Sequence, residues 1–221
     1  MLEGILNLDG PRFGPVSGKK AEQLVILLHG VGADGQDLIG LAPFLAQSMP
    51  DAGFVSPNAP FTCDMAPYGY QWFSLQDRSP SSILAGVQAT APILNAFIDS
   101  ELSAHGLASD KLALIGFSQG TMMSLYISPR REDAAAGVVG FSGRLVGPDL
   151  LENELQSRPP MLLIHGDADP VVPFESLGLA EEGLQSAGIQ VDTMVRPGLG
   201  HGIDEQGMAG AAAFLKGCFG L

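Results

Sequence analysis

The sequence predicts an α/β protein with a mostly parallel central sheet covered by helices on both faces. Segments 24–28, 112–117 and 161–166 are short, apolar and without alternation, as is typical of strands buried on both faces. Segments with helical length and periodicity separate them, which indicates βαβ units. The carboxyl ends of parallel strands open onto one edge, where ligands bind. We therefore expect the glycine-rich ends of these strands to share a site.

The N-terminal part is expected to be irregular before the first strand. Residues 1–23 are rich in glycine and proline and leave room for an edge hairpin around Asp9-Gly10. After strand 24–28 comes a glycine-rich loop, and leucine and methionine then recur at helical spacing over 36–49. A brief strand over 54–56 stops at the following proline.

A long stretch without helical or strand periodicity occupies residues 57–81. Loops of this length are usually functional or disordered, and the aromatic content of this one favours an ordered loop. Residues 82–105 then form a long helix with one apolar face, and Pro92 predicts a kink in it.

The remaining elements alternate regularly. They are strand 112–117, helix 121–126, strand and turn 136–143, a weak helix over 148–156, strand 161–166, helix 175–187 ended by Gly188, strand 191–195 and helix 205–219. No repeat or linker interrupts this order, so residues 1–221 are expected to form one domain.

Composition and charge indicate which kinds of partner and which cellular compartment to expect. The net charge of −13 disfavours nucleic acid and anionic membrane surfaces. The N-terminus lacks the pattern of a signal peptide, and no apolar run approaches the length of a membrane span, so stable membrane insertion is not expected. Cys63 and Cys218 are far apart and fit neither a disulfide framework nor a metal site. A soluble cytoplasmic protein is the expectation.

The segment Gly116-Phe117-Ser118-Gln119-Gly120 joins a buried strand to a helix. G-x-S-x-G in this context is typical of a nucleophile elbow, a sharp turn that raises a strained serine above the sheet. Glycine is needed where neighbouring backbone packs closely. The alternative is a glycine-rich turn with an incidental serine, and the rest of the chain decides between the two.

A serine nucleophile requires a base, which follows it in chain order in α/β-hydrolases. His29 precedes the serine, His105 ends a helix, and His165 ends a buried strand, where a structural role is expected. His201 lies in a glycine-rich loop between the last strand and the last helix, and is the candidate base.

The acid that orients the base should follow the strand at 161–166. Asp169 precedes a proline and is held extended, whereas Asp167 lies closer to the strand and is suited to bonding backbone N–H groups of the turn. The spacing favours Asp169 and leaves Asp167 open.

The oxyanion of the reaction needs two backbone donors. The amide of Gln119 follows the nucleophile, and the loop His29-Gly30-Val31-Gly32 supplies a second donor, for which we select Val31. A phosphate-binding function for this loop is disfavoured, because the P-loop lysine and the G-x-G-x-x-G spacing are absent.

Five ordered motifs together resemble the phospholipase/carboxylesterase family of α/β-hydrolases, which includes acyl-protein thioesterases and small bacterial carboxylesterases. The motifs are 28–34 (LHGVGAD), 71–73 (QWF), 116–120 (GFSQG), 165–173 (HGDADPVVP) and 200–202 (GHG). The resemblance implies an α/β-hydrolase fold, the triad Ser118, Asp169 and His201, and the Val31 and Gln119 amides as oxyanion hole. It also implies that Trp72 and Phe73 border the acyl pocket, although they could equally be packed core. The family often has leucine where Val31 stands, a change that leaves the amide in place.

These observations predict a serine hydrolase that cleaves carboxylic esters or thioesters with short-to-medium acyl chains and requires no metal or organic cofactor. Its partner is expected to be a small ester or lipid-like substrate. A lysophospholipase and an acyl-protein thioesterase are the alternatives within the class, and Ser118 argues against a dienelactone hydrolase or a dehalogenase. A non-catalytic binding protein of the same fold is the alternative outside it. The apolar helices are also compatible with a homodimer.

Overall fold

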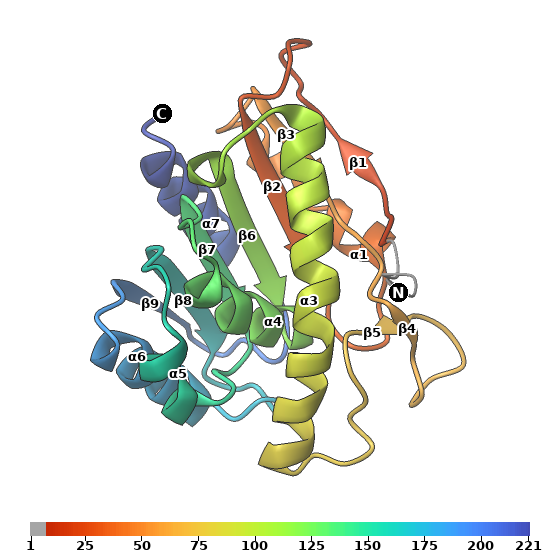
Figure 1. Cartoon of the computed structure of the whole chain (residues 1–221), viewed down its shortest axis with the longest axis vertical. Coiled ribbons are helices and arrows are strands. Elements are labelled where there is room, and N and C mark those ends of the chain that lie inside the picture. Colours follow the sequence, from red (N-terminus) through yellow and green to blue (C-terminus); the bar gives the residue numbers. More distant parts are fainter. Residues whose placement is uncertain (1–7) are drawn as a thin grey trace.

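A computed structural model describes residues 8–221 and has a seven-stranded sheet at its centre (Figure 1). The strand order is β1-β3-β2-β6-β7-β8-β9, and all neighbours are parallel except β1 and β3. The strands are β1 (Arg12–Phe13), β2 (Gln23–Leu28), β3 (Ala52–Val55), β6 (Leu112–Phe117), β7 (Gly137–Phe141), β8 (Met161–Gly166) and β9 (Val191–Arg196). The predicted α/β class with a mostly parallel sheet is confirmed.

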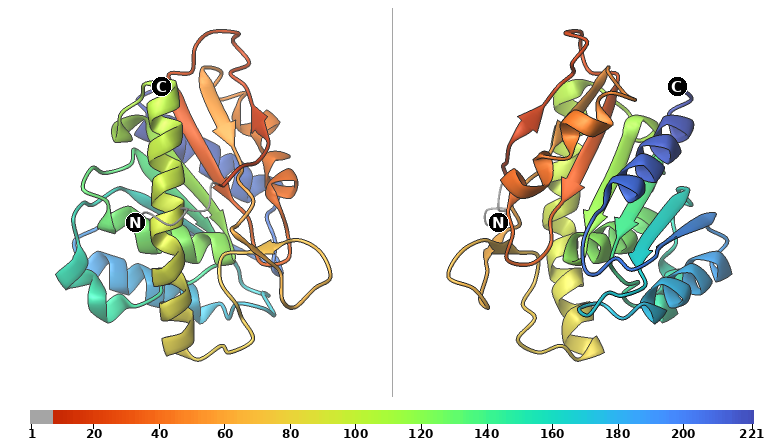
Figure 2. Two further views of the ribbon diagram at one scale, coloured as in Figure 1. Left: turned by 45° about the vertical axis from the view of Figure 1, so that its right-hand side comes forward. Right: turned by 180° about the vertical axis from the view of Figure 1, so that it is seen from behind.

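Helices cover both faces of the sheet (Figure 2). One face carries α3 (Pro80–His105), α4 (Gln119–Ile127), α5 (Pro148–Glu154) and α6 (Glu175–Ser186). The other carries α1 (Gly35–Ile39), α2 (Ala42–Leu45) and α7 (Glu205–Cys218). The central strands supply both cores, because successive side chains of a strand point to opposite faces. In β6, for example, Leu112 and Leu114 face the first group of helices, and Ala113 and Ile115 face the second.

The helix that follows β6 is the most enclosed of the chain. All nine residues of α4 are buried, and it contacts β2, β6, β7 and α3. A helix enclosed in this way needs apolar or small side chains all round, which the sequence QGTMMSLYI largely provides. Ser118, which directly precedes this helix, is therefore attached to a segment that is packed in the core of the protein.

One prediction for the N-terminal part was wrong, and a second falls partly outside the described residues. The helix expected over 36–49 is two short helices, α1 and α2, because Pro43 lacks an N–H and its ring would clash with the carbonyl four residues earlier. Of the hairpin expected around Asp9-Gly10, residues 1–7 lie outside the described chain. In the described part, β1 pairs antiparallel with β3.

The stretch 57–81 has a defined path, as expected, and contains a small hairpin of β4 (Phe61–Thr62) and β5 (Tyr70–Gln71). Its second strand is tied to the loop after β2: Gly32 N donates to Tyr70 O (2.8 Å), and Tyr70 N donates to Ala33 O (2.8 Å). Gly69 makes this approach possible, since a Cβ at that position would lie 2.1 Å from Gly32 O. The two loops therefore form one wall above the sheet.

Helix α3 begins at Pro80, where Ser79 caps it by accepting from Ser82 N (3.3 Å), and it continues through Pro92 to Gly106. By length and composition alone it could cross a membrane, although core helices of globular proteins pass the same test. In the structure its apolar side packs on the sheet and on α4.

Candidate active site

Ser118 lies between β6 and α4 with φ 54° and ψ −112°, in the left-handed region that side chains rarely adopt. Two bonds to one carbonyl hold the turn: Ser118 N donates to Phe141 O (2.9 Å), and Thr121 Oγ1 donates to the same oxygen (2.8 Å). Strain of this kind costs on the order of 1–3 kcal/mol and persists only where surrounding contacts impose it. These contacts give the strand, turn and helix of an elbow.

The two glycines of the elbow, Gly116 and Gly120, occupy positions where there is no room for a Cβ atom. A Cβ on Gly116 would lie 2.5 Å from Thr121 N, and one on Gly120 would lie 1.9 Å from Leu28 O. Both neighbours are backbone atoms, which cannot move aside as a flexible side chain can. The close packing predicted for G-x-S-x-G is therefore present at both glycines.

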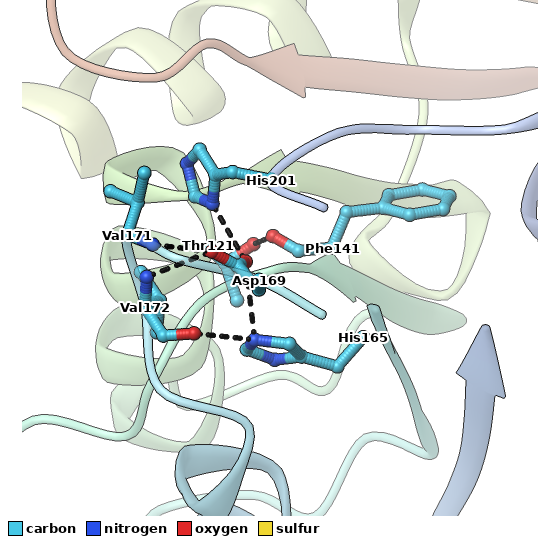
Figure 3. Close-up of polar contacts among 7 residues, drawn as sticks. All are labelled: Thr121, Phe141, His165, Asp169, Val171, Val172 and His201. Atoms are coloured by element: carbon cyan, nitrogen blue, oxygen red, sulfur yellow. Dashed lines mark hydrogen bonds and ion pairs between the residues drawn. The ribbon is translucent and has the colours of Figure 1, made fainter. Parts of the chain in front are cut away.

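Asp169 and His201 meet above the sheet, from the loops after β8 and β9 (Figure 3). His201 Nδ1 lies 2.8 Å from Asp169 Oδ2, and Asp169 Oδ1 accepts from the amides of Val171 (2.8 Å) and Val172 (3.0 Å). Burial of this carboxyl tends to raise its pKa, but the bonds from His201 and the two amides outweigh burial and hold the pKa of Asp169 below its usual value. The carboxylate can only accept, so Nδ1 of His201 carries a proton and Nε2 is left as the basic nitrogen.

A second histidine contacts the same carboxylate. His165 Nε2 lies 3.0 Å from Val172 O and 3.3 Å from Asp169 Oδ2 (Figure 3). The carbonyl can only accept, so Nε2 of His165 carries a proton and points it between the two oxygens. The structural role predicted for His165 fits this geometry, but its proximity to Asp169 was not foreseen from the sequence.

Asp167 lies apart from this pair. Its Oδ1 accepts from Gly198 N (2.6 Å), in the loop that carries His201. We expected Asp167 to bond backbone N–H groups of its own turn, and it instead joins two loops. The two ends of this loop are joined to each other, because the Arg196 guanidinium donates to Asp204 at 2.8–3.1 Å. Asp204 also caps α7 by accepting from Gly207 N (2.8 Å).

His201 lies beside the elbow. Its ring packs on Phe117, the residue before the serine, with centroids 4.9 Å apart. The hydrogen bonds within residues 8–221 include none between His201 and Ser118 Oγ. Such bonds are often long before substrate binds. The structure therefore brings His201 to the elbow and to Asp169 without a direct bond to Ser118.

A hollow of about 170 Å³ opens at Ser118. Both amides selected for the oxyanion belong to residues that line it, Val31 and Gln119, and neither amide donates a hydrogen bond within residues 8–221. Val171, Val172 and Pro173 of the 165–173 motif also line it. The remaining lining residues, which no motif indicated, are Met65, Leu75, Arg78, Ile83, Met122 and Arg144. Most of this wall is apolar, so it suits an acyl chain.

Trp72 and Phe73 are fully or almost fully buried, and neither is among the residues that line this hollow. They lie one layer behind it. The Gln119 side chain accepts from Trp72 N (2.8 Å) and donates to Phe73 O (2.7 Å), so it pairs with their backbone as a strand would. Their backbone thus supports the segment after Ser118 through Gln119, and a position beside the acyl pocket stays a prediction.

The loop that carries Val31 depends on a buried histidine. His29 Nε2 accepts from Ala59 N (3.0 Å), and its carbonyl accepts from Trp72 Nε1 (2.9 Å). Burial lowers the pKa of His29, which keeps the ring neutral. This histidine fixes the loop and is too enclosed to act as the base.

Comparison with known proteins settles the family. A model of the phospholipase/carboxylesterase family matches residues 16–219, nearly the whole chain. The chain belongs to this family. It is accordingly a hydrolase of the esterase and thioesterase class with an α/β-hydrolase fold, as the motifs predicted.

Two relatives illustrate the family. Esterase YpfH of Escherichia coli is 33% identical over 198 residues, which cover 90% of this chain and 84% of the relative. The acyl-protein thioesterase 1 homolog 1 of Dictyostelium discoideum is 29% identical over 185 residues, which cover 80% and 82%. Among solved structures, esterase PE8 superposes with a TM-score of 0.92 at 42% identity and covers 96% of this chain and 99% of that protein.

Proposed function

We propose that this family member is a serine hydrolase that cleaves carboxylic esters or thioesters with short-to-medium acyl chains, within one domain over residues 1–221. Ser118 is the nucleophile, His201 the general base and Asp169 the residue that orients it. The observation that carries the proposal is the 2.8 Å contact between His201 and the buried Asp169, beside a strained serine that opens into an apolar hollow.

In the first half of the reaction, Ser118 Oγ attacks the carbonyl carbon and its proton passes to His201 Nε2. The Val31 and Gln119 amides bind the resulting oxyanion, and Asp169 stabilises the imidazolium. The bond from the carbonyl carbon to the alkoxy oxygen or thiol sulfur then breaks. His201 gives its proton to that leaving group, and the acyl group remains on Ser118.

In the second half, water attacks the acyl-enzyme and His201 Nε2 takes a proton from it. The ester bond to Ser118 Oγ breaks, the carboxylic acid leaves, and His201 returns the proton to the serine. No step requires a metal or an organic cofactor, so the chain's own residues account for the whole cycle.

The acyl-chain range rests on the size and chemistry of the hollow. Its volume of about 170 Å³ suits a chain of a few carbons, and its wall includes Met65 and Val171, whose side chains are 49% and 61% exposed. Lysophospholipids and acylated proteins are the alternative substrates within the class, because named relatives include acyl-protein thioesterases. The two free cysteines and the acidic composition are compatible with action in the cytoplasm.

The test uses p-nitrophenyl acetate, butyrate, octanoate and palmitate together with an acyl thioester. Wild type should hydrolyse the butyrate and octanoate esters fastest, and Ser118→Ala should lose at least about 10³-fold in kcat. A fluorophosphonate should label wild type only, and mass spectrometry should place the label on Ser118. A label on another residue, or equal rates for both proteins, would overturn the assignment of Ser118, and no turnover with no label would favour a binding protein of hydrolase fold.

Ser142 offers a matched control. It also follows a strand of the sheet, with φ 47°, and its buried Oγ has no hydrogen-bond partner within residues 8–221. Ser142→Ala therefore removes a hydroxyl in a similar backbone setting without breaking a bond. It should retain wild-type turnover and labelling.

A further inference from the structure

Arg144 contacts the hollow at Ser118 and a second, larger one. The second hollow has a volume of about 350 Å³ and adjoins the first, since Ile83 and Arg144 line both. Its remaining wall is mostly apolar and includes Leu145, Val146, Pro148, Leu179 and Ala180. Arg144 therefore stands where a substrate that fills the first hollow would extend into the second.

The position of Arg144 is fixed by the elbow. The preceding residue, Gly143, packs so closely on α4 that a Cβ there would lie 2.3 Å from Thr121 Cβ and 3.1 Å from Ser118 O. Ser142, one residue earlier, is held in the left-handed region and donates its N–H to Ile164 O (2.9 Å). The contacts that set the nucleophile thus also set the start of the arginine.

The guanidinium of Arg144 is half-buried and has no partner. Within residues 8–221 its side chain forms neither an ion pair nor a hydrogen bond. Other arginines pair with carboxylates, namely Arg12, Arg130, Arg131 and Arg196. Burial lowers the pKa of Arg144, and no carboxylate acts in the opposite direction, although an arginine keeps its charge at neutral pH.

A second guanidinium lines the same hollow. Arg78 also has no carboxylate partner within residues 8–221, and its Nε donates only a long bond to Leu75 O (3.4 Å). Within residues 8–221, Arg158 is the third arginine without a carboxylate partner, so two of these three lie at one hollow in a chain with 24 acidic and 11 basic residues. The long-range field of such a chain repels anions, so a local positive group is needed wherever an anion is to bind.

We propose that Arg144, assisted by Arg78, binds an anionic group of the substrate, a carboxylate or a phosphate placed several bonds from the scissile carbonyl. A guanidinium can donate two parallel N–H hydrogen bonds to either group. It is also more weakly hydrated than an ammonium, so its transfer from water into the site costs less free energy. The natural substrate is accordingly an ester or thioester that carries a negative charge. This inference rests on the proposed hydrolase function of Ser118.

The test compares esters that differ only in charge. The first pair is p-nitrophenyl pentanoate and mono-p-nitrophenyl glutarate, which have acyl chains of equal length. The second pair is 1-butyrylglycerol and 1-butyrylglycerol 3-phosphate, which place a phosphate on the alcohol side. Wild type should have the higher kcat/KM for the anionic member of one pair, and the pair that shows the preference identifies the anion. The preference should become smaller when the salt concentration is raised to about 1 M, because screening weakens an ionic contact at a pocket mouth.

Arg144→Met should lower kcat/KM for the preferred anionic ester by about 10–100-fold and change the neutral ester by less than about twofold. Arg144→Lys should recover part of the loss because it restores the charge. The matched control is Arg158→Met, which removes the same charge from an exposed site outside both hollows. It should leave the preference unchanged. Equal losses for neutral and anionic esters, or no preference in wild type, would overturn the proposal.

The experiments distinguish a failure of the proposed hydrolase function from a failure of the proposed anion site at Arg144. If no ester is turned over faster by wild type than by Ser118→Ala, the proposed function is wrong. Binding of the intact glutarate half-ester and the phosphate ester to Ser118→Ala, measured by isothermal titration calorimetry, then still reports on Arg144. Tighter binding of an anionic ester than of its neutral counterpart, lost on adding Arg144→Met, supports the anion site, and equal binding refutes it.

Discussion

Nε2 of His165 lies 3.3 Å from Oδ2 of Asp169, the same carboxylate oxygen that lies 2.8 Å from Nδ1 of His201. The carboxylate is completely buried between the two imidazoles, while its other oxygen accepts from two amides (Figure 3). A buried carboxylate with every direction occupied cannot rotate away from the base. His165 is thus a positioning residue for the candidate acid.

His165→Phe should lower kcat by about tenfold, because it removes the proton shared by Asp169 and the Val172 carbonyl and leaves that carbonyl unpaired. His165→Gln can return an N–H to nearly the same place and should recover much of the activity. A purely structural role would lower stability without changing the pH dependence. The acid limb of the kcat/KM profile should therefore shift in His165→Phe, and an unchanged profile would contradict a positioning role.

Asp169→Asn should lower kcat by about 10⁴-fold, since an amide does not hold His201 in the required tautomer. The change should also be visible in stability. The folded-state pKa of Asp169 is lowered, so its ionisation stabilises the fold above the unfolded pKa of about 3.9, and this contribution is lost as the pH falls through the lower folded value. The difference in free energy of unfolding between wild type and Asp169→Asn should be full at pH 7 and shrink below about pH 4.

Urea unfolding monitored by tryptophan fluorescence across this pH range measures that difference. Asp167→Asn serves as the control, because its amide oxygen can still accept from Gly198 N and it does not contact His201. Its activity should stay within about twofold of wild type. If Asp167→Asn instead caused the larger loss, the acid would have been assigned to the wrong aspartate.

Gln119→Ala should destabilise the fold by about 2–4 kcal/mol, because Trp72 N and Phe73 O would each lose a buried partner. Gln119→Met fills the same space without the polar atoms, so it should show most of that loss. The backbone amide proposed for the oxyanion remains in both variants. Turnover per folded molecule at low temperature should therefore persist, and its disappearance would mean that the side chain itself acts in catalysis.

Gly120→Ala should lower the free energy of unfolding by about 3 kcal/mol or more, or prevent folding, because its methyl group would overlap the Leu28 carbonyl. Gly178→Ala is the matched control. That glycine lies on the exposed side of α6 with nothing within 4 Å of a Cβ, and the change should stabilise the helix by about 0.5–1 kcal/mol. Calorimetric melting separates the two, and similar melting temperatures would contradict the steric argument.

The sequence predicted the central strands and their loops well because these strands are buried on both faces and lead into loops or turns that contain glycine. Segment 112–117 and strand β6 have the same bounds. The edge strand β1 was harder to predict, because it is only two residues long. Its pairing with β3 also depends on a contact between segments that are distant in the sequence, which no local pattern indicates. Pro43 does carry a local signal for the break between α1 and α2, but the surrounding leucine spacing obscured it.

At the site, the structure brings the predicted residues that follow strand ends close together, whereas most residues that line the hollow were not predicted from the sequence. Ser118, Asp169 and His201 are fixed by chain order and by the shared edge of the sheet. Met65, Arg78 and Arg144 come from loops whose approach depends on tertiary packing, so nothing in their sequence surroundings marks them. Trp72 carried a visible motif, yet it lies behind the hollow because its indole is needed to hold the His29 carbonyl.

The complete enclosure of α4 has a consequence for how the enzyme fails. Amides of a fully packed helix exchange with solvent only when the whole protein opens, whereas loops with few apolar contacts open locally at a much smaller free energy. Ser118 is attached to the first kind of segment, and His201 lies on the second, in a loop that is partly to fully exposed. Mild heat or denaturant should therefore detach the base while the nucleophile stays in place. Turnover would then be lost before the protein unfolds globally, and it would return on cooling without a refolding step.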